Sequence, residues 1–483
     1  MLKNTARLTA LLTAFSFLVS CAEKAPSEPE PQAETVPVTE EVTTEEAVPA
    51  AAISGELVKG NIYDANGKLL VSSELQEDGS TKRVYEKEYA VPFANIITEM
   101  SAGFDTTFND IMTEENPVGD DYSFEYPVGQ SIQLTIDGDV QKKIYDYMDE
   151  QNIVGSCVVL RTDGSILSQV SYPSYDPTTV KDQKYDEKLA WGDVGNKAFQ
   201  NYEPGSCFKI MSEVISDKHG IYEQWDEGEW DFGGTPIVNW DHETAKESYP
   251  MSRSLYWAFV CSSNIFFAKT FDQIGVDAVL DDLNTIFHFG QDNDIQCDFG
   301  DIENNVEIYC DDDLRRTAFG QSYVLTCPIY LAALGREAAF GDMVRPFVLK
   351  NVVDTNDGKT VIGDGSKAND VIASIPAEYR QGLLDGMMGV ASETGIYPPE
   401  GYTLYAKTGT AETWLDDDFL YITGAIVNEK DDPKKTYEDY SKYGENGSYT
   451  VVFQVQNPSE LGYAFAINAS ALYGDIIDIL LEK

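Results

Sequence analysis

The chain has 483 residues, with 34 lysines and arginines against 82 aspartates and glutamates, so its formal net charge is −48. A surface this acidic repels phosphate backbones and anionic headgroups, which excludes nucleic acid as a partner. The length allows two or three domains, and a hydrophobic content of 42% with 12% aromatic residues indicates that most of the chain folds.

The first 21 residues are typical of a secretory signal that ends in a lipidation site. Lys3 and Arg7 precede a short apolar segment, residues 8–19, which is too short to span a bilayer comfortably. This segment leads into Leu-Val-Ser-Cys, which resembles the bacterial lipobox, so Cys21 is expected to become a lipid-modified N-terminus after cleavage. The alternative is an ordinary signal peptide with a chance cysteine at that position.

Residues 22–53 are predicted to be an extended linker. They hold eight glutamates, one lysine and five prolines, and their apolar residues show no periodicity. Such a segment cannot bury enough apolar surface to offset the entropy of ordering it, and its glutamates repel one another. We therefore expect a spacer that separates a folded domain from the membrane.

Strand and helix patterns follow in chain order. Residues 58–72 predict two strands around Asn66-Gly67, whereas residues 73–125 are polar with few clear elements. Residues 131–136 alternate as a strand, and Asp137 or Asp139 can cap a helix after it. The later predicted elements are two strands within 154–172 around Thr162-Asp163-Gly164, apolar alternation at 402–408, 419–427, 449–456 and 462–468, and a helix from about Ala471. Strands before and after a helical middle predict an α+β or α/β sheet built from both ends of the chain.

The first motif that could carry chemistry is a Ser-x-x-Lys pair within Pro204–Lys209. Ser206 opens a predicted amphipathic helix, and Lys209 lies on the same helical face because the two are three residues apart. A desolvated lysine can lose its proton near neutral pH and act as a base toward the serine. Such a match arises roughly once or twice by chance in a chain of this composition, so alone it is weak.

Two further motifs follow. Ser262-Ser263-Asn264 lies between the apolar helical stretches 255–260 and 265–271, where a polar triplet needs partners; the plain alternative is a helix junction with a capping serine. Lys407-Thr408-Gly409-Thr410 ends the predicted strand from residue 402. There the glycine leaves room for a ligand chain against the strand edge, the lysine brings positive charge, and the threonines bring hydrogen-bond donors.

Taken together and in this order, the three motifs resemble the Ser-x-x-Lys, Ser-x-Asn and Lys-Thr-Gly set of the penicillin-recognising serine enzymes. Further segments narrow the resemblance to class B, monofunctional penicillin-binding proteins. These segments are residues 59–67, residues 134–137 with Gln141, residues 170–177, Gly320-Gln321 with Thr326 and Pro328, and residues 407–412. The resemblance covers residues 58–72 and about 130–483.

The resemblance implies the fold shared by penicillin-binding transpeptidases and serine β-lactamases. This is an α+β sandwich with an antiparallel sheet flanked by helices, and here a small β-containing N-terminal module. The implied domains are a lipoprotein signal (1–21), the acidic linker (22–53), a reduced pedestal-like module (54–127) and the transpeptidase domain (128–483). The chain departs from the family pattern where Lys59 replaces the usual arginine, Cys207 a threonine and Ser322 a glycine.

The resemblance also implies residue roles. Ser206 would attack the penultimate D-alanine carbonyl of a peptidoglycan stem peptide, Lys209 would take its proton, and Ser262 would pass a proton to the departing D-alanine. Lys407 would stabilise this network. The substrate-binding residues would be Asn264, Thr408, Gly409 and Thr410, with the backbone N–H groups of Ser206 and Thr410 as the oxyanion hole. No metal or cofactor is implied.

The expected partners are stem peptides, β-lactam antibiotics, the membrane through the lipid on Cys21, and an unidentified glycosyltransferase or division or elongation protein. The expected location is the outer face of the bacterial cytoplasmic membrane. A D,D-carboxypeptidase or β-lactamase on the same site, and a catalytically silent tethered β-lactam-binding scaffold, remain alternatives. A role in elongation, division or sporulation stays open.

Among the other cysteines, Cys207 and Cys261 are predicted to be buried structural thiols, because they adjoin Ser206 and Ser262 in apolar surroundings. A disulfide between Cys297 and Cys310 stays open, since export permits it and nothing requires it. No Cys-x-x-Cys pair occurs, so a zinc site is not predicted.

Overall fold

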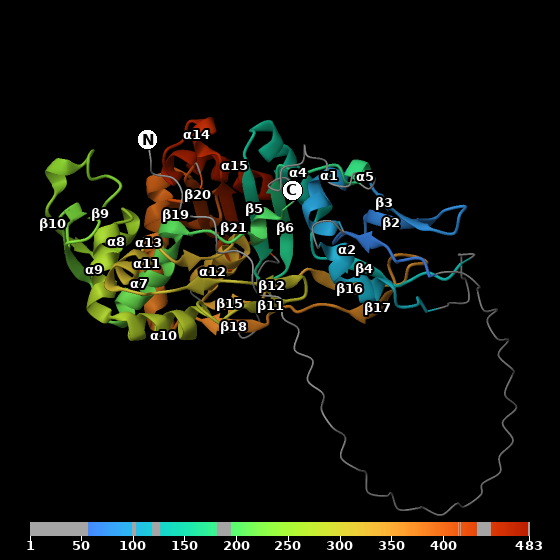
Figure 1. Ribbon diagram of the computed structural model, residues 1–483, viewed down its shortest axis with the longest axis horizontal. Helices are drawn as coiled ribbons and strands as arrows, with labels where there is room; N and C mark the ends of the chain where they lie inside the picture. The colour runs from blue at the N-terminus through green and yellow to red at the C-terminus, as the bar shows by residue number, and fades with distance from the viewer. Residues whose placement is uncertain are drawn as a thin grey trace, which may run out of the picture. The chain divides into compact units, whose positions relative to one another are not determined.

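A five-stranded antiparallel sheet organises the fold, and its strands come from distant parts of the sequence. The structure, a computed structural model, describes residues 57–98, 103–117, 126–180, 195–413, 415, 417–431 and 446–481. The predicted leader (1–21) and linker (22–53) fall in residues 1–56 and lie outside them. The strand order is β19 (Tyr402–Ala411), β20 (Phe419–Asn428), β21 (Tyr449–Val455), β5 (Gly155–Arg161) and β6 (Ile166–Tyr172). The edge strand β19 ends in the Lys-Thr-Gly motif (Figure 1).

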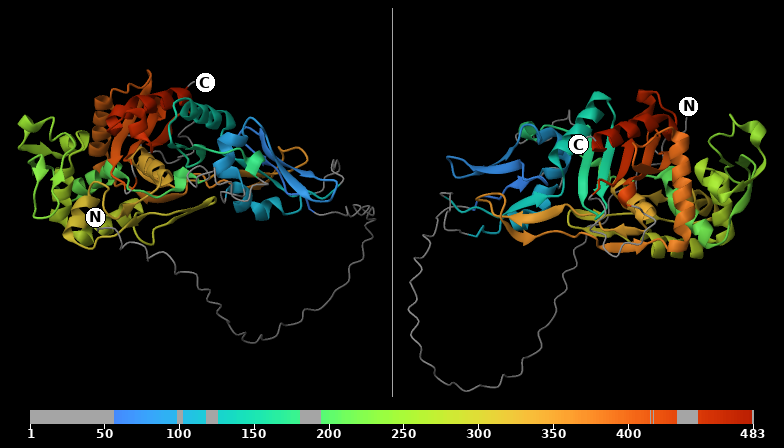
Figure 2. Two further views of the ribbon diagram at one scale, coloured as in Figure 1. Left: turned by 45° about the horizontal axis from the view of Figure 1, so that its top comes forward. Right: turned by 180° about the vertical axis from the view of Figure 1, so that it is seen from behind.

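Helices cover both faces of this sheet. Successive side chains of a strand point to opposite sides, and the central strands carry buried residues at nearly every position, so both faces need cover. Val158 and Val452 pack on one face with α12 (Pro328–Phe340), whose residues are all buried. Cys157 and Phe453 face the other way, toward α4 (Gly138–Glu150) and α15 (Ser470–Leu481). Figures 1 and 2 show the sheet between these layers. The predicted α+β class, with an antiparallel sheet flanked by helices, is confirmed.

A second, mixed sheet joins early and late strands. Its order is β17 (Val361–Asp364), β16 (Leu349–Val353), β4 (Ser131–Leu134), β1 (Ile62–Tyr63), β2 (Leu69–Leu75) and β3 (Thr81–Tyr85). β1 and β2 form the predicted hairpin, in which Gly67 has φ +79°. β1 also pairs in parallel with β4, which pairs in turn with β16, so strands of the first hundred residues belong to the same sheet as strands from much later in the chain.

The helices next to the first two motifs lie beyond the edge strand β19, on the side away from β20. They are α7 (Lys209–Lys218), α8 (Leu255–Val260) and α9 (Asn264–Ile274), and they pack with α10 (Val276–Phe287), α11 (Asp311–Thr317) and α13 (Ala377–Thr394). Between α7 and α8 the chain forms a lobe of short strands, β7 (Glu223–Asp226), β8 (Glu229–Trp230), β9 (Ile237–Val238) and β10 (Met251–Ser254). Because α13 contacts β19, α7 and α8, it links the edge strand to the motif helices.

The remaining elements are short. The helices among them are α1 (Ala90–Ile97), α2 (Phe104–Thr107), α3 (Asn109–Met112), α5 (Pro177–Val180) and α14 (Pro458–Leu461). The strands are β11 (Ile295–Cys297), β12 (Gly300–Ile302), β13 (Asn305–Val306), β14 (Val324–Leu325), β15 (Asp342–Val344) and β18 (Val371–Ser374). The strand β3 and the helix α1 fall in the segment 73–125, where the sequence pattern showed few clear elements.

One predicted strand is wrong. Residues 462–468 alternate in hydrophobicity, yet they form a turn that leads into a 3₁₀ segment, Ala466–Ala469. Ala466 is buried, whereas the side chain of Phe465 is 39% exposed. The apolar residues of this segment therefore do not share one buried face, as those of a strand in a sheet would. The predicted helix after them is confirmed as α15, and the predicted cap of α4 is Asp137, which accepts hydrogen bonds from the N–H groups of Asp139 and Val140.

Candidate active site

The turn that carries Ser206 lies directly against the edge strand β19. A 3₁₀ turn, Gly205–Phe208, precedes α7, so the predicted helix begins one turn later than its motif suggested. Gly205 has φ +53°, and a Cβ there would lie 2.4 Å from the carbonyl oxygen of Thr410. A Cβ on Gly409 would lie 2.9 Å from the backbone nitrogen of Cys207 and 3.0 Å from the carbonyl oxygen of Pro204. Both glycines therefore allow a contact of backbone on backbone that holds Ser206 beside the Lys-Thr-Gly strand.

Lys209 is surrounded by four oxygen atoms. Its Nζ lies 2.8 Å from Ser206 Oγ, 2.8 Å from the Ser262 carbonyl oxygen, 3.1 Å from Ser262 Oγ and 2.7 Å from Asn264 Oδ1. The carbonyl and amide oxygens can only accept hydrogen bonds. A neutral amine has two N–H groups, which these two oxygens occupy. Its lone pair then remains for a serine hydroxyl, and Ser206 is the nearer one.

Ser262 bridges the two motif lysines. Its Oγ lies 3.1 Å from Lys209 Nζ and accepts a hydrogen bond of 3.0 Å from Lys407 Nζ, which also donates to the Thr408 carbonyl oxygen at 2.8 Å. Ser262 itself has φ +59°, an unusual backbone conformation for a residue other than glycine. A hydroxyl within hydrogen-bond distance of two amines can pass a proton, and backbone strain of this kind is typical of functional sites.

Burial makes the two lysines chemically unlike ordinary surface lysines. The side chain of Lys209 is fully buried, and this desolvation, with the positive charge of Lys407 second, holds its pKa well below the usual value. Burial also lowers the pKa of Lys407, to about 8. Burial therefore shifts Lys209 toward its neutral form beside Ser206, whereas Lys407, with a pKa of about 8, stays mostly protonated near pH 7.

A cleft of about 340 Å³ opens above this cluster. Ser206, Ser262, Asn264, Thr408 and Thr410 line it, whereas the buried Lys209 and Lys407 reach it through the serine hydroxyls. The other lining residues are Val238, Asn239, Trp240, Val260, Cys261, Phe319, Gln321, Glu412, Asp418, Phe465, Ala466 and Ile467. The cleft thus has a polar floor of motif residues and largely apolar walls, which suits a peptide substrate.

Residues 155–476, two thirds of the chain, match the protein family described as penicillin binding protein transpeptidase domain. The chain belongs to this family. Penicillin-binding protein 3 of Bacillus subtilis is 27% identical over 358 residues, covering 69% of this chain and 49% of that relative. Peptidoglycan D,D-transpeptidase PbpA of Mycobacterium tuberculosis is 26% identical over 322 residues, covering 60% of this chain and 62% of that relative. The chain therefore spans about half to two thirds of the length of these relatives.

Solved structures share the fold. Penicillin-binding protein A of M. tuberculosis, solved as an acyl-enzyme complex, superposes with a TM-score of 0.70 at 20% identity over 88% of this chain and 99% of that one. The D,D-transpeptidase domain of a peptidoglycan glycosyltransferase from Eggerthella lenta superposes with a TM-score of 0.68 at 19% identity, covering 87% and 99%. The predicted membership of the class B penicillin-binding proteins is confirmed.

The structure brings together the eight residues that the three motifs predicted for the site. Cys21, the predicted lipidation site, lies outside the described residues. Sequence reasoning missed the apolar walls, above all Trp240 and Phe465, whose rings lie 5.6 Å apart. Both are on irregular segments far from the motifs, so no spacing pattern pointed to them. Glu412 could have been predicted, because it is the last residue of the segment 407–412 that resembles the family.

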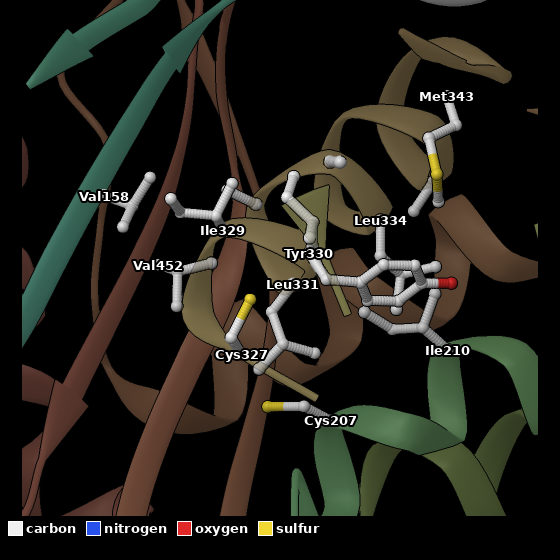
Figure 3. Packing of buried hydrophobic residues seen from close by; sticks show 14 of the residues in the cluster. Val158, Cys207, Ile210, Cys327, Ile329, Tyr330, Leu331, Leu334, Met343 and Val452 are labelled. Carbon is white, nitrogen blue, oxygen red and sulfur yellow. The ribbon is translucent and has the colours of Figure 1, made fainter. Parts of the chain in front are cut away.

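The two cysteines beside the serines differ. Cys207 is fully buried as predicted, and Figure 3 shows it among Leu331, Cys327 and other apolar residues. Burial raises the pKa of its thiol to about 12, and the thiol donates a long hydrogen bond of 3.6 Å to the Lys407 carbonyl oxygen. Cys261 corrects the prediction, since it is only partly buried and lines the cleft. Arg253 Nη1 donates to its Sγ at 2.9 Å, so the sulfur has a polar partner as well as apolar neighbours in the chain.

Cys297 and Cys310 are free thiols, so the disulfide that the sequence left open is not formed in the structure. Cys310 is the exposed N-cap residue of α11. Within the described parts of the chain, no cluster of three or more His, Cys, Asp or Glu side chains is placed to hold a metal ion. No helix in those same parts has the length and apolar character needed to cross a bilayer.

Proposed function

We propose that the chain is a peptidoglycan D,D-transpeptidase that cross-links stem peptides through an acyl-enzyme on Ser206 and is acylated by penicillin at the same residue. The observation that carries this proposal is the contact of 2.8 Å between Ser206 Oγ and the Nζ of the buried Lys209. Family membership and the name of the PbpA relative, a peptidoglycan D,D-transpeptidase, support it.

In the first half-reaction, the Ser206 hydroxyl gives its proton to Lys209, and its Oγ forms an ester bond with the carbonyl carbon of the penultimate D-alanine. The lowered pKa of Lys209 favours the neutral amine, which is the form that can accept that proton. The peptide bond to the terminal D-alanine breaks. Its nitrogen takes a proton from Ser262 Oγ, which regains one from the protonated Lys209, 3.1 Å away.

In the second half-reaction, an amine of a neighbouring stem peptide attacks the ester carbonyl. The same groups act in reverse: the amine loses a proton through Ser262 to Lys209, and the Ser206 oxygen takes one back as the ester breaks. The product is a new peptide bond between two stems. Lys407, mostly protonated near pH 7 because its pKa is about 8, holds the Ser262 oxygen through the 3.0 Å hydrogen bond.

The remaining motif residues are proposed to bind the donor stem. Asn264 lines the cleft and would hydrogen-bond the stem backbone, while Thr408 and Thr410 would hold the terminal carboxylate. Gly409 allows the strand to approach the nucleophile turn. The backbone N–H groups of Ser206 and Thr410 would bind the oxyanion, an interaction that commonly contributes a few kcal/mol to transition-state stabilisation.

We further propose that residues 1–21 are a lipoprotein signal whose Cys21 carries the lipid, and that residues 22–53 are the spacer. Residues 54–127 would form the reduced N-terminal module and residues 128–483 the transpeptidase domain. Support comes from the lipobox-like sequence and the acidic, proline-rich linker. The enzyme would then act at the outer face of the cytoplasmic membrane, where its substrate is assembled, beside a glycosyltransferase or a division or elongation protein.

The test has two parts. Ser206→Ala should abolish covalent labelling by fluorescent penicillin, whereas Ser216→Ala, which removes a buried hydroxyl from α7, the helix that follows the Ser206 turn, should keep it. A penicillin adduct on any other residue contradicts the assignment. The purified enzyme should then form dimeric cross-links on a lipid-linked peptidoglycan polymer. Release of D-alanine without dimers would identify a carboxypeptidase instead, and absence of labelling in the wild type would identify a silent scaffold.

A further inference from the structure

A buried polar cluster lies behind the turn that carries Ser262, and none of the three motif roles uses it. Its members are Asp226 at the end of β7, Asn239 just after β9, Arg253 in β10, and Ser263 on the turn itself. Asp226 is 0% exposed and Ser263 1% exposed. Three of the four residues belong to the short-stranded lobe between α7 and α8, so the lobe reaches the site through this cluster.

The carboxylate of Asp226 is the centre of the cluster. Its Oδ2 accepts hydrogen bonds from Ser263 Oγ at 2.7 Å and from Arg253 Nε at 2.8 Å. Asn239 Nδ2 lies 2.8 Å and 3.0 Å from its two oxygens, and the N–H of Gly228 donates to Oδ1 at 3.0 Å. A buried charge is tolerated only when it is paired and hydrogen-bonded in this way. The same bonds fix the positions of all its donors.

These donors in turn hold the residues on both sides of Ser262. Asn239 Oδ1 accepts from the N–H of Asn264 at 2.8 Å, and Ser263 Oγ accepts from the N–H of Phe266 at 3.1 Å. Both N–H groups belong to the first turn of α9, and N–H groups in the first turn of a helix have no acceptor within the helix. On the preceding side, Arg253 Nη1 donates to Cys261 Sγ at 2.9 Å. The cluster therefore fixes the chain before and after the serine.

Ser262 needs such support because its backbone is strained. At φ +59° a serine is in the left-handed region, and residues stay in such conformations only when their surroundings over-determine them. Its Oγ must also remain within hydrogen-bond distance of Lys209 and Lys407 at once, at 3.1 Å and 3.0 Å. A relaxed turn would satisfy the backbone and lose one or both of these contacts.

We propose that Asp226 is a positioning residue for the acyl-transfer reaction: through Ser263, Asn239 and Arg253 it holds the strained turn so that Ser262 Oγ stays between the two lysines. This inference rests on the proposed acyl-transfer function of the site. Asp226 touches neither substrate nor the reacting atoms, and it acts only through the placement of Ser262. The short-stranded lobe is thereby part of the catalytic machinery rather than a peripheral insertion.

The experiment separates binding of a β-lactam from the acylation step by stopped-flow kinetics on the full-length protein. Asp226→Asn removes the charge and one acceptor with little change in shape. We expect the acylation rate constant to fall about 100-fold, as for a catalytic group displaced by about 1 Å. The dissociation constant of the non-covalent complex should change less than about threefold, because Asp226 itself does not line the cleft.

Asp105→Asn is the matched control. Asp105 is also 0% exposed and paired with an arginine, since its Oδ1 lies 2.6 Å from Arg83 Nη2, but it belongs to α2 and does not line the cleft. It should lower the melting temperature to a similar extent and leave the acylation rate constant within about twofold. Equal losses of acylation in both variants would mean that Asp226 serves stability alone, and would overturn the proposal.

Ser263 provides a milder variant should Asp226→Asn fold poorly. Ser263→Ala removes only the hydroxyl that joins the turn to Asp226, and we expect roughly tenfold slower acylation, whereas Ser263→Thr, which keeps a hydroxyl, should recover most of it. An unchanged rate in Ser263→Ala contradicts the proposal.

A crystal structure of Asp226→Asn tests the geometry without any reaction. Ser262 Oγ should move by about 1 Å or more away from at least one lysine, and an unmoved turn overturns the inference. The wild-type arm keeps the two hypotheses apart: a wild type that penicillin does not label refutes the proposed function, while the position of the turn in the variant still decides the role of Asp226.

Discussion

Replacing Lys407 with methionine is expected to change stability and activity in opposite directions. Lys407 is fully buried, and burial lowers its pKa from 10.5 to about 8. Its charge is therefore tolerated by the folded state only at a cost, while the unfolded chain carries it in water without one. Methionine has a similar length and no charge. The variant should lose acylation because Ser262 Oγ loses the hydrogen bond from Lys407 Nζ.

The lowered pKa of Lys407 determines how the stability of the wild type changes with pH. Because the folded-state pKa lies below the unfolded one, the unfolded chain binds the proton more tightly, and stability rises with pH between about 8 and 10.5. Below pH 8 both states are protonated and the full cost is present. At about 1.4 kcal/mol per pH unit this interval corresponds to about 3 kcal/mol. The methionine variant also lacks the hydrogen bonds from Lys407 Nζ to Ser262 Oγ and to the Thr408 carbonyl. Each loss lowers its stability by about 1 kcal/mol at any pH.

Lys407→Met should thus be about 1 kcal/mol more stable than the wild type at pH 7 and about 2 kcal/mol less stable near pH 10.5. Urea unfolding of both proteins across pH 7–10 measures the difference at each pH, which cancels the titration of groups that do not interact with Lys407. The swing of about 3 kcal/mol is diagnostic, because it does not depend on the value assigned to the hydrogen bonds. A difference that stays constant with pH within about 1 kcal/mol would refute the reasoning.

Three further predictions concern the same chain. The second-order rate constant for acylation by benzylpenicillin should rise with pH as Lys209 loses its proton, well below the usual lysine pKa, and fall above about pH 8 as Lys407 loses its own; a rate that keeps rising to pH 10 contradicts this. Cys207→Thr should leave that rate within about twofold, because a threonine hydroxyl can replace the thiol as donor to the Lys407 carbonyl; a rate controlled by dithiothreitol in the parent would reveal a function for the thiol. Cys21→Ser should stay unprocessed or be released from the membrane, and persistent labelling by radioactive palmitate in that variant would contradict lipidation at Cys21.

Local chemistry explains which elements could be predicted from the sequence. The hairpin at Asn66-Gly67 needs a residue with positive φ, and Gly67 supplies it at +79°. Asp137 caps α4 through its own side chain, an interaction within three residues of the helix start. The segment 462–468 failed because alternation alone cannot tell a strand from a turn whose apolar residues face different partners. There Phe465 packs against Trp240, from a segment more than two hundred residues earlier.

In the site, too, features set by neighbouring residues could be predicted from the sequence, and features set by distant residues could not. Ser206 and Lys209 share a motif because one turn of backbone must place both, so their spacing is visible in the sequence. Asp226 and Asn239 bond to the Ser262 turn across 37 and 25 residues of chain, from strands of only two to four residues. Strands this short leave no periodic pattern. Their partners are chosen by tertiary packing, and only the folded structure identifies them.

The turn after α11 offers a prediction that separates backbone strain from side-chain bonding. Ser322, where the family commonly has glycine, has φ +73°, and its Oγ donates to Asp313 Oδ1 at 2.9 Å. Ser322→Gly removes about 1 kcal/mol of strain and loses a bond of about 1–2 kcal/mol, so its stability should stay within about 1 kcal/mol of the wild type. Ser322→Ala loses the bond and keeps the strain, so it should be about 1–2 kcal/mol less stable. Thermal unfolding at one pH gives the order directly. If the alanine variant equals or exceeds the glycine variant in stability, the left-handed backbone does not strain this turn, and the serine needs another explanation.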